Sequence, residues 1–165
     1  PIFEEEEDAE LFARLVRHRR VAIVDDGIPG RQHLAAGDIA LADVPAATWS
    51  PQARIHFINS LPADLPAEKL GEIDAAWNLS NTRNAEIGRT WFIQVAERRY
   101  TPAYDALEAH LNRYGRGRLI APVYVALASN GEDRALALEM FARAKSTYHP
   151  IAVDWIQSGL DATGR

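Results

Sequence analysis

The sequence predicts an all-α protein, and three observations support that prediction. Apolar residues recur at three- and four-residue spacing along most of the chain, which is the pattern of a helix with one buried face. Ser50-Pro51 and Thr101-Pro102 are typical helix starts, because the hydroxyl can cap and proline needs no N–H at the first helical position. Short connectors join the segments, so consecutive helices should pack as antiparallel pairs. We therefore expect an α-α superhelix of about eight helices.

The first 48 residues are the least regular part of the chain. Leu11, Phe12, Leu15 and Val16 give one apolar face to a helix expected over residues 5–20. Residues 21–24 either extend that helix or form a short strand, and periodicity does not separate the two. Residues 25–30, D-D-G-I-P-G, have the composition of a turn, and residues 31–48 are expected to be mostly loop.

Residues 50–114 predict four helices. The first begins at Ser50-Pro51, and the second runs from about Pro66 to Trp77. The third begins near Asn84, and the fourth runs from Thr101-Pro102 to Tyr114. The apolar residues that we expect on their buried faces are Ile55, Phe57, Ile58, Leu61, Leu70, Ile73, Ile87, Trp91, Val95, Tyr104, Leu107 and Leu111.

Three further helices are expected after residue 118. Residues 119–128 are almost all apolar, so this helix should be buried on most sides and form the hub of the core. The next begins at residues 130–133 and buries Leu136, Met140 and Ala144, and the last begins at Pro150. We expect Ile151, Trp155 and Ile156 to face inward and residues 161–165 to form a frayed tail. Stacked helix pairs of this kind form a solenoid like armadillo or HEAT arrays, although no residue-level repeat is visible.

The four tryptophans are expected to be structural. Trp77, Trp91 and Trp155 fall on apolar stripes, which favours core packing over a ligand shelf. Trp49 precedes the Ser50 cap, where it can pack as a hydrophobic staple.

Composition limits the classes of function. The 165 residues fit one domain, the formal net charge is −5, and there is no cysteine for a disulfide, a thiolate metal site or a nucleophile. Net acidity disfavours nucleic acid as a partner. The acidic run at residues 4–8 is expected to be a solvated helix start. No apolar run reaches the ~20 residues that cross a bilayer, so we expect no membrane partner and a cytoplasmic location. The chain begins with Pro1, and we expect it to be a piece of something larger.

No catalytic or metal-binding motif is recognisable, and we predict no catalytic residue and no metal ligand in this chain. The five histidines are far apart in sequence, and none belongs to an H-E-x-x-H pair. There is no G-x-S-x-G elbow, no P-loop and no G-x-G-x-x-G turn.

The stretch that stands out is L-N-R-Y-G-R-G-R-L-I-A-P, residues 111–122. Arg116 and Arg118 precede or begin a helix, where the helix dipole makes cations unfavourable unless an anion binds there. In the alternative interpretation, Arg113 and Arg116 stabilise the C-terminus of the preceding helix, where positive charge is favourable. The residues alone favour that alternative.

Three segments, Trp77–Trp91, Tyr114–Pro122 and Lys145–Pro150, together resemble the C-terminal helical domain of leukotriene-A4 hydrolase and its relatives, zinc aminopeptidases of the M1 family. The resemblance extends over about residues 50–160 in order, spacing and helix pattern. It implies a superhelical domain, residues 1–165 here, that packs against a catalytic zinc domain of the same polypeptide and walls one side of its cleft. The zinc and the general acid-base glutamate are expected in that other domain.

The resemblance also assigns a role to the basic turn. Arg116 matches a family arginine, and Arg118 matches a family lysine, that bind the carboxylate of the substrate; Gly115 and Gly117 support the turn. Arginine in place of lysine keeps the charge but changes the geometry of its hydrogen bonds. Leu119 and Ala121 stand where the family has an aromatic and a basic residue, and epoxide hydrolysis is not implied.

We therefore expect the non-catalytic C-terminal domain of an M1 aminopeptidase, in which Arg116 and Arg118 bind the free carboxylate of a short peptide. The alternative is a free-standing helical-repeat module that binds a protein partner. An independent hydrolase that uses a histidine with an acidic residue is the weakest hypothesis.

Overall fold

The computed structural model describes residues 48–59, 61 and 65–164, which contain seven α-helices and no strand. The helix and the turn expected within residues 1–47 lie outside the described residues. In chain order the helices are α2 (Pro51–Asn59), α3 (Ala67–Trp77), α4 (Ala85–Glu97), α5 (Tyr104–Arg113), α6 (Gly117–Ser129), α7 (Arg134–Ala144) and α8 (Pro150–Ala162). Three single 3-10 turns join them, η4 (Leu79–Asn81), η5 (Thr101–Ala103) and η6 (Lys145–Thr147).

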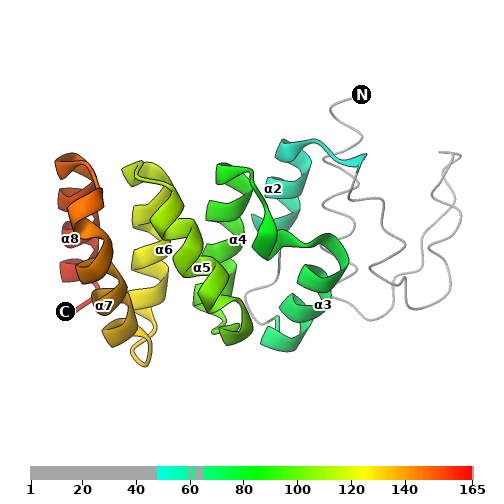
Figure 1. Ribbon diagram of the computed structural model, residues 1–165. Coiled ribbons are helices and arrows are strands. Elements are labelled where there is room, and N and C mark those ends of the chain that lie inside the picture. The colour runs from blue at the N-terminus through cyan, green and yellow to red at the C-terminus, as the bar shows by residue number, and fades with distance from the viewer. Residues whose placement is uncertain (1–47, 60, 62–64, 165) are drawn as a thin grey trace, which may run out of the picture.

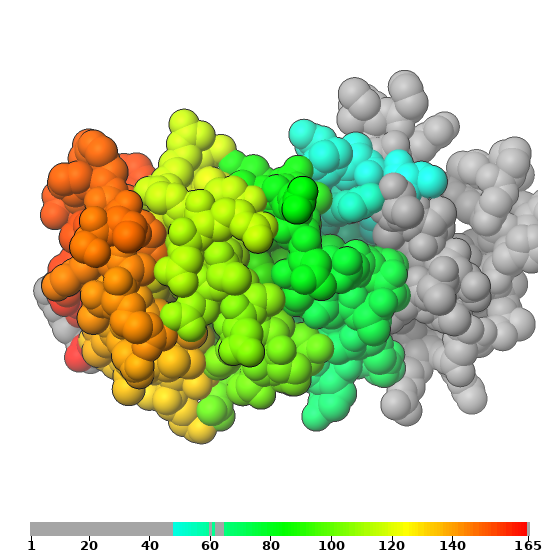
Figure 2. All heavy atoms as spheres, in the orientation of Figure 1, coloured from blue at the N-terminus to red at the C-terminus, as the bar shows by residue number. Residues whose placement is uncertain are grey.

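The helices form two layers (Figure 1). Helices α2, α4, α6 and α8 lie side by side in one layer, where each contacts the next, and α3, α5 and α7 cover them in the other. Figure 2 shows this second layer as a continuous packed surface from α7 across to α3. Each consecutive pair runs antiparallel, so the predicted α-α superhelix is confirmed.

Helix α6 is the centre of the core, as its composition predicts. It contacts α4, α7 and α8, and it begins two residues earlier than expected, at Gly117. Its buried residues are Gly117, Leu119, Ile120, Ala121, Val123, Tyr124, Ala126, Leu127 and Ala128. Because this helix is covered on several sides, its sequence is apolar almost throughout rather than along one stripe.

Two of the predicted helix starts have side-chain caps, and the cap at Ser50 was predicted. Ser50 Oγ accepts a hydrogen bond from the Ala53 N–H at 3.2 Å. Asn84 Oδ1 accepts hydrogen bonds from the N–H groups of Glu86 and Ile87 at 3.0 and 3.1 Å. The Thr101-Pro102 signal marks the η5 turn, and α5 begins just after it.

The start of α7 differs from the sequence expectation. Asp133 occupies the N-cap position but makes no capping hydrogen bond. Its buried carboxylate instead accepts hydrogen bonds from Arg99 Nε at 3.0 Å and from the Tyr104 hydroxyl at 2.6 Å. Asp133, expected within the first turn of this helix, therefore precedes it and joins the end of α4 and the start of α5 to α7.

The prediction that Ile151 and Trp155 face inward is wrong. Their residues are 57% and 54% exposed, whereas Ile156 is fully buried as predicted. The buried stripe of α8 is Ala152, Ile156 and Leu160, and each exposed residue precedes a buried one by a single position, about 100° around the helix. Periodicity does not choose between two adjacent apolar stripes.

The other tryptophans agree better with the predicted structural roles. Trp91 is fully buried and donates from Nε1 to Ser80 Oγ at 3.0 Å, and Trp77 packs its half-buried ring on Phe57 at 4.7 Å. Trp49 is buried against the rings of Phe57 and Trp77.

The chain end is also more ordered than predicted, since α8 continues to Ala162. The guanidinium of Arg134 donates to the Leu160 carbonyl at 3.0 Å and to the Thr163 hydroxyl, which ties the start of α7 to the end of α8. Within the described part of the chain, no helix is both long enough and apolar enough to span a bilayer.

Candidate functional site

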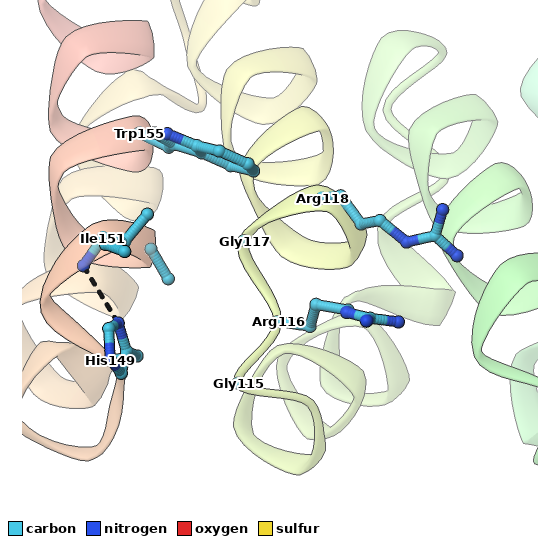
Figure 3. Close-up of a pocket in the computed structure, with 8 residues that line it drawn as sticks. Gly115, Arg116, Gly117, Arg118, His149, Ile151 and Trp155 are labelled. Carbon is cyan, nitrogen blue, oxygen red and sulfur yellow. Dashed lines mark hydrogen bonds between the residues drawn. The ribbon is translucent and has the colours of Figure 1, made fainter.

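The predicted turn residues lie together at the start of α6. Gly115 and Arg116 form the link from α5, and Gly117 and Arg118 are the first two residues of α6. With the start of α8 they line a hollow of about 250 Å³ (Figure 3). The residues of α8 and its cap that line it are His149, Ile151, Ala152 and Trp155.

The start of α6 has no side-chain cap, which it shares with the starts of α3, α5 and α7, but it alone among these has an arginine at the N-cap position. Arg116 occupies the N-cap position with extended backbone, φ −83° and ψ 117°, and no side chain caps the helix. By contrast, Ser50 caps α2, Asn84 caps α4, and His149 Nδ1 accepts from the Ile151 N–H at 3.2 Å at the start of α8. An arginine has no acceptor atom, so it adds positive charge to an end that already carries partial positive charge.

The two arginines differ in their partners. Arg118 is exposed and forms an ion pair with Glu86 of α4, whose other carboxylate oxygen lies 3.6 Å from Arg89 Nε. Arg116 is also exposed, but its guanidinium makes no hydrogen bond or ion pair with any residue in the described ranges. The charge of Arg118 is therefore partly neutralised within the domain, and that of Arg116 is not.

Both guanidinium groups lie outside the hollow. Figure 3 shows the side chains of Arg116 and Arg118 extending to the same side, away from Trp155, Ile151 and His149 on α8. The walls of the hollow come largely from the apolar surfaces of Ile151, Ala152 and Trp155. The turn thus has two faces, an apolar face toward α8 and a cationic face on the side of α4.

The structure places Arg113 in the last turn of α5, where positive charge is favourable, and the stabilisation of that helix end by arginines stays a prediction. The end of α5 is closed by its backbone, since the Tyr114 N–H donates to the His110 carbonyl at 3.2 Å. Neither Arg113 nor Arg116 hydrogen-bonds a helix carbonyl of the described residues.

The two glycines of the turn have different roles. A Cβ on Gly117 would lie 2.7 Å from Trp155 Cε3 and 3.3 Å from Ala152 Cα, so only glycine lets α8 approach the start of α6 this closely. A Cβ on Gly115 would meet no atom within 4 Å, and its φ is not in the left-handed region. Gly117 therefore positions the turn, whereas nothing in the structure requires glycine at 115.

Sequence reasoning missed the contribution of α8 to this site. It treated His149 as an ordinary histidine and Trp155 as a core residue. The His149-Pro150 pair was the available signal, because it marks the start of α8. It does not indicate which segment packs against that start. That the neighbour is the Gly115–Arg118 turn was not readable from the sequence.

No metal-binding cluster accompanies these groups in the described residues. Among residues 48–59, 61 and 65–164, no three His, Asp or Glu side chains come close enough together to hold a metal ion. The described residues therefore do not fit a zinc site. What the turn supplies is positive charge beside an apolar surface.

Comparison with known proteins gives a consistent family. The family model described as leukotriene A4 hydrolase, C-terminal, matches residues 49–160. The chain is 28% identical over 118 residues to leucine aminopeptidase 2 of Pyricularia oryzae, a match that covers 70% of this chain and 19% of that protein. It is 26% identical over 124 residues to aminopeptidase B of Homo sapiens, a match that covers 72% of this chain and 19% of that protein.

A solved structure, that of native yeast LTA4 hydrolase, superposes with a TM-score of 0.68 at 20% identity. The match covers 96% of this chain and 26% of that one, and it bears on the fold alone. The chain spans about a fifth of the length of the curated aminopeptidases that it matches. With the family model matching 112 consecutive positions, residues 49–160, this chain belongs to the leukotriene A4 hydrolase C-terminal domain family.

Proposed function

We propose that this chain is the non-catalytic C-terminal domain of an M1 zinc aminopeptidase and that Arg116 binds the terminal carboxylate of a short peptide substrate. In a full-length protein the domain would wall one side of the substrate cleft. The relatives bear the names of aminopeptidases, which supports the class of reaction. The zinc and the acid-base residue would belong to the catalytic portion.

The observation that carries the proposal is the unneutralised positive charge at the start of α6. Arg116 has no partner in the described residues, and the helix behind it has no side-chain cap. A carboxylate placed there would accept from the guanidinium and from free N–H groups at the helix end, and it would lie at the favourable end of the dipole. Such an anchor fixes the distance between the peptide C-terminus and the scissile bond.

Arg118 is proposed to have a supporting role. It pairs with Glu86 and extends to the same side as Arg116. To contact the substrate, the Arg118 guanidinium would have to weaken or break its ion pair with Glu86. The free energy of that ion pair would then be subtracted from the gain in substrate binding. Arg118 therefore raises the positive potential at the carboxylate, and its removal is expected to weaken binding less than removal of Arg116.

Charge reversal at Arg116 tests the proposal in the full-length enzyme. With Arg116→Glu, kcat/KM for a tripeptide with a free carboxylate is expected to fall by about 10- to 100-fold, because charge-assisted hydrogen bonds contribute about 1.5–3 kcal/mol. For the same tripeptide with a C-terminal amide, the loss should be much smaller. Steady-state kinetics on both substrates gives the comparison.

Arg113→Glu is the matched control, because Arg113 is an equally exposed arginine three residues earlier, at the end of α5. It should affect both substrates alike and only weakly. Equal losses on the free and amidated peptides with Arg116→Glu would remove the carboxylate role while leaving the family assignment intact.

A free-standing interaction module is the rival function. No specific feature of the described residues favours it over the aminopeptidase domain. A coding sequence in which an H-E-x-x-H motif and a later glutamate precede this domain would support the aminopeptidase, and a gene that encodes this domain alone would support the module.

A further inference from the structure

A second hollow, of about 270 Å³, lies between the η4 turn and α5. Its polar lining comes from two segments, the η4 turn with the two residues after it, and α5. These polar residues are Ser80, Asn81, Thr82, Arg83, His110 and Arg113. None of the described residues that line it is aspartate or glutamate. It is separate from the Gly115–Arg118 turn in its lining residues.

Both arginines at this hollow are unpaired. Arg83 and Arg113 are exposed, and neither forms a hydrogen bond or an ion pair through its side chain with the residues that the structure describes. The other lining groups add donors. Asn81 Nδ2 uses one N–H on Asn78 Oδ1 at 2.6 Å and keeps a second, and the Thr82 hydroxyl accepts from the Asn84 N–H at 3.3 Å and keeps its own hydrogen.

His110 supplies an independent observation. It is only 4% exposed, and its Nε2 is buried with no hydrogen-bond partner among the described residues. The ring is fixed between Phe92 and Tyr114, with centroid distances of 5.0 and 4.8 Å, and the absence of a side chain on Gly88 leaves room for it. A buried polar atom without a partner is costly, and among the described residues the protein supplies no group that pairs with this one.

We propose that this hollow binds a phosphate group, carried either by inorganic phosphate or by a phosphate monoester. Two guanidinium groups, an amide and a hydroxyl offer more donors than the two oxygens of a carboxylate use, whereas a phosphate has three or four oxygens to accept them. The hollow, at about 270 Å³, is larger than several water molecules. It therefore has room for a phosphate and for part of the group esterified to it.

The test is a titration of the 165-residue chain with sodium phosphate at pH 7 and constant ionic strength, followed by the imidazole C–H resonances of His110 in NMR spectra. Phosphate is expected to move these resonances saturably. Arg83→Gln and Arg113→Gln should each weaken binding about tenfold or more, since each removes a charge-assisted hydrogen bond. Both side chains are exposed, so the variants should keep the fold.

Arg116→Gln is the control that separates this site from the proposed peptide anchor, and it should leave phosphate binding unchanged. A second titration with glycerol phosphate shows whether the hollow prefers the free ion or a phosphate monoester. Tighter binding of glycerol phosphate than of inorganic phosphate indicates a monoester, and weaker binding indicates the free ion. Acetate should bind at least about tenfold more weakly than phosphate. The proposal is overturned if the resonances do not saturate, if either arginine variant binds phosphate as tightly as the wild type, or if acetate binds as tightly as phosphate.

Discussion

At the scale of the residue, the most informative position is the N-cap of α6. Ser, Thr, Asp and Asn are favoured at such positions because their side chains accept hydrogen bonds from free N–H groups. Arg116 does the opposite, and it has no compensating acid within the described residues. A residue that breaks a local rule without a visible gain in stability is a candidate for function.

His110 gives a prediction about pH. Burial, with a smaller contribution from the charge of Arg113, lowers the pKa of His110 to about 4, whereas an unfolded histidine titrates near 6.5. As pH falls through this interval the unfolded chain takes up the proton first, so the free energy of unfolding decreases between about pH 6.5 and 4. The histidine alone accounts for a loss of at most about 3 kcal/mol.

Urea denaturation of the wild type and of His110→Gln at pH 7 and pH 4.5 checks this prediction. The wild type should lose more stability than the variant over that interval. Arg113→Gln removes the neighbouring positive charge, raises the pKa of His110 and should reduce the loss. Identical pH dependence in all three proteins would show that His110 titrates normally in the folded state.

At the scale of the element, the contact between α6 and α8 depends on small residues. Gly117 allows the close approach at the start of α6, and a Cβ on Gly159 would lie 2.5 Å from Val125 Cγ2 near its other end. Since α8 is the last helix, this contact holds the chain end in place and sets where Trp155 lies relative to the turn.

Gly117→Ala is expected to destabilise the domain by about 1–3 kcal/mol, because the added methyl group overlaps Trp155 and approaches the backbone of Ala152. Gly115→Ala, two residues earlier, should be neutral or slightly stabilising, since its Cβ has open space and alanine reduces the entropy of the unfolded chain. The midpoints of urea denaturation compare the two. Equal midpoints would mean that α8 moves aside at no cost.

At the scale of the whole molecule, the Asp133 cluster joins segments far apart in sequence. Its carboxylate accepts from Arg99 just after α4 and from Tyr104 at the start of α5, while Arg99 also pairs with Glu132. Desolvation, followed by the hydrogen bond to Asp133, raises the pKa of Tyr104, so its hydroxyl remains a donor. Arg99 has a positive φ of 53°, which places its side chain at this junction.

Asp133→Asn should therefore lower the free energy of unfolding by about 1.5–3 kcal/mol, because a buried charged acceptor is replaced by a neutral group with an N–H facing donors. Glu139→Gln is the control, since it removes the exposed ion pair between Glu139 and Arg143 within α7 and should leave the denaturation midpoint nearly unchanged. If both substitutions leave the midpoint unchanged, the cluster does not hold the helix pairs together.

The sequence by itself determined the helices, their order and most of their buried faces. Caps at Ser50 and Asn84 and apolar spacing within each segment are local signals, which act over one to four residues. The resemblance of Trp77–Trp91, Tyr114–Pro122 and Lys145–Pro150 to a known family, expected over about residues 50–160, is confirmed by the family model over residues 49–160.

The tertiary structure decided what depends on contacts between distant segments. It selected Ala152 rather than Ile151 for the core, because the neighbouring α6 covers one of two adjacent apolar stripes. It paired Arg118 with Glu86 and left Arg116 without a partner, and it buried His110 against Gly88. These outcomes follow from packing across 20 or more residues of sequence, where local periodicity carries no information about the partner.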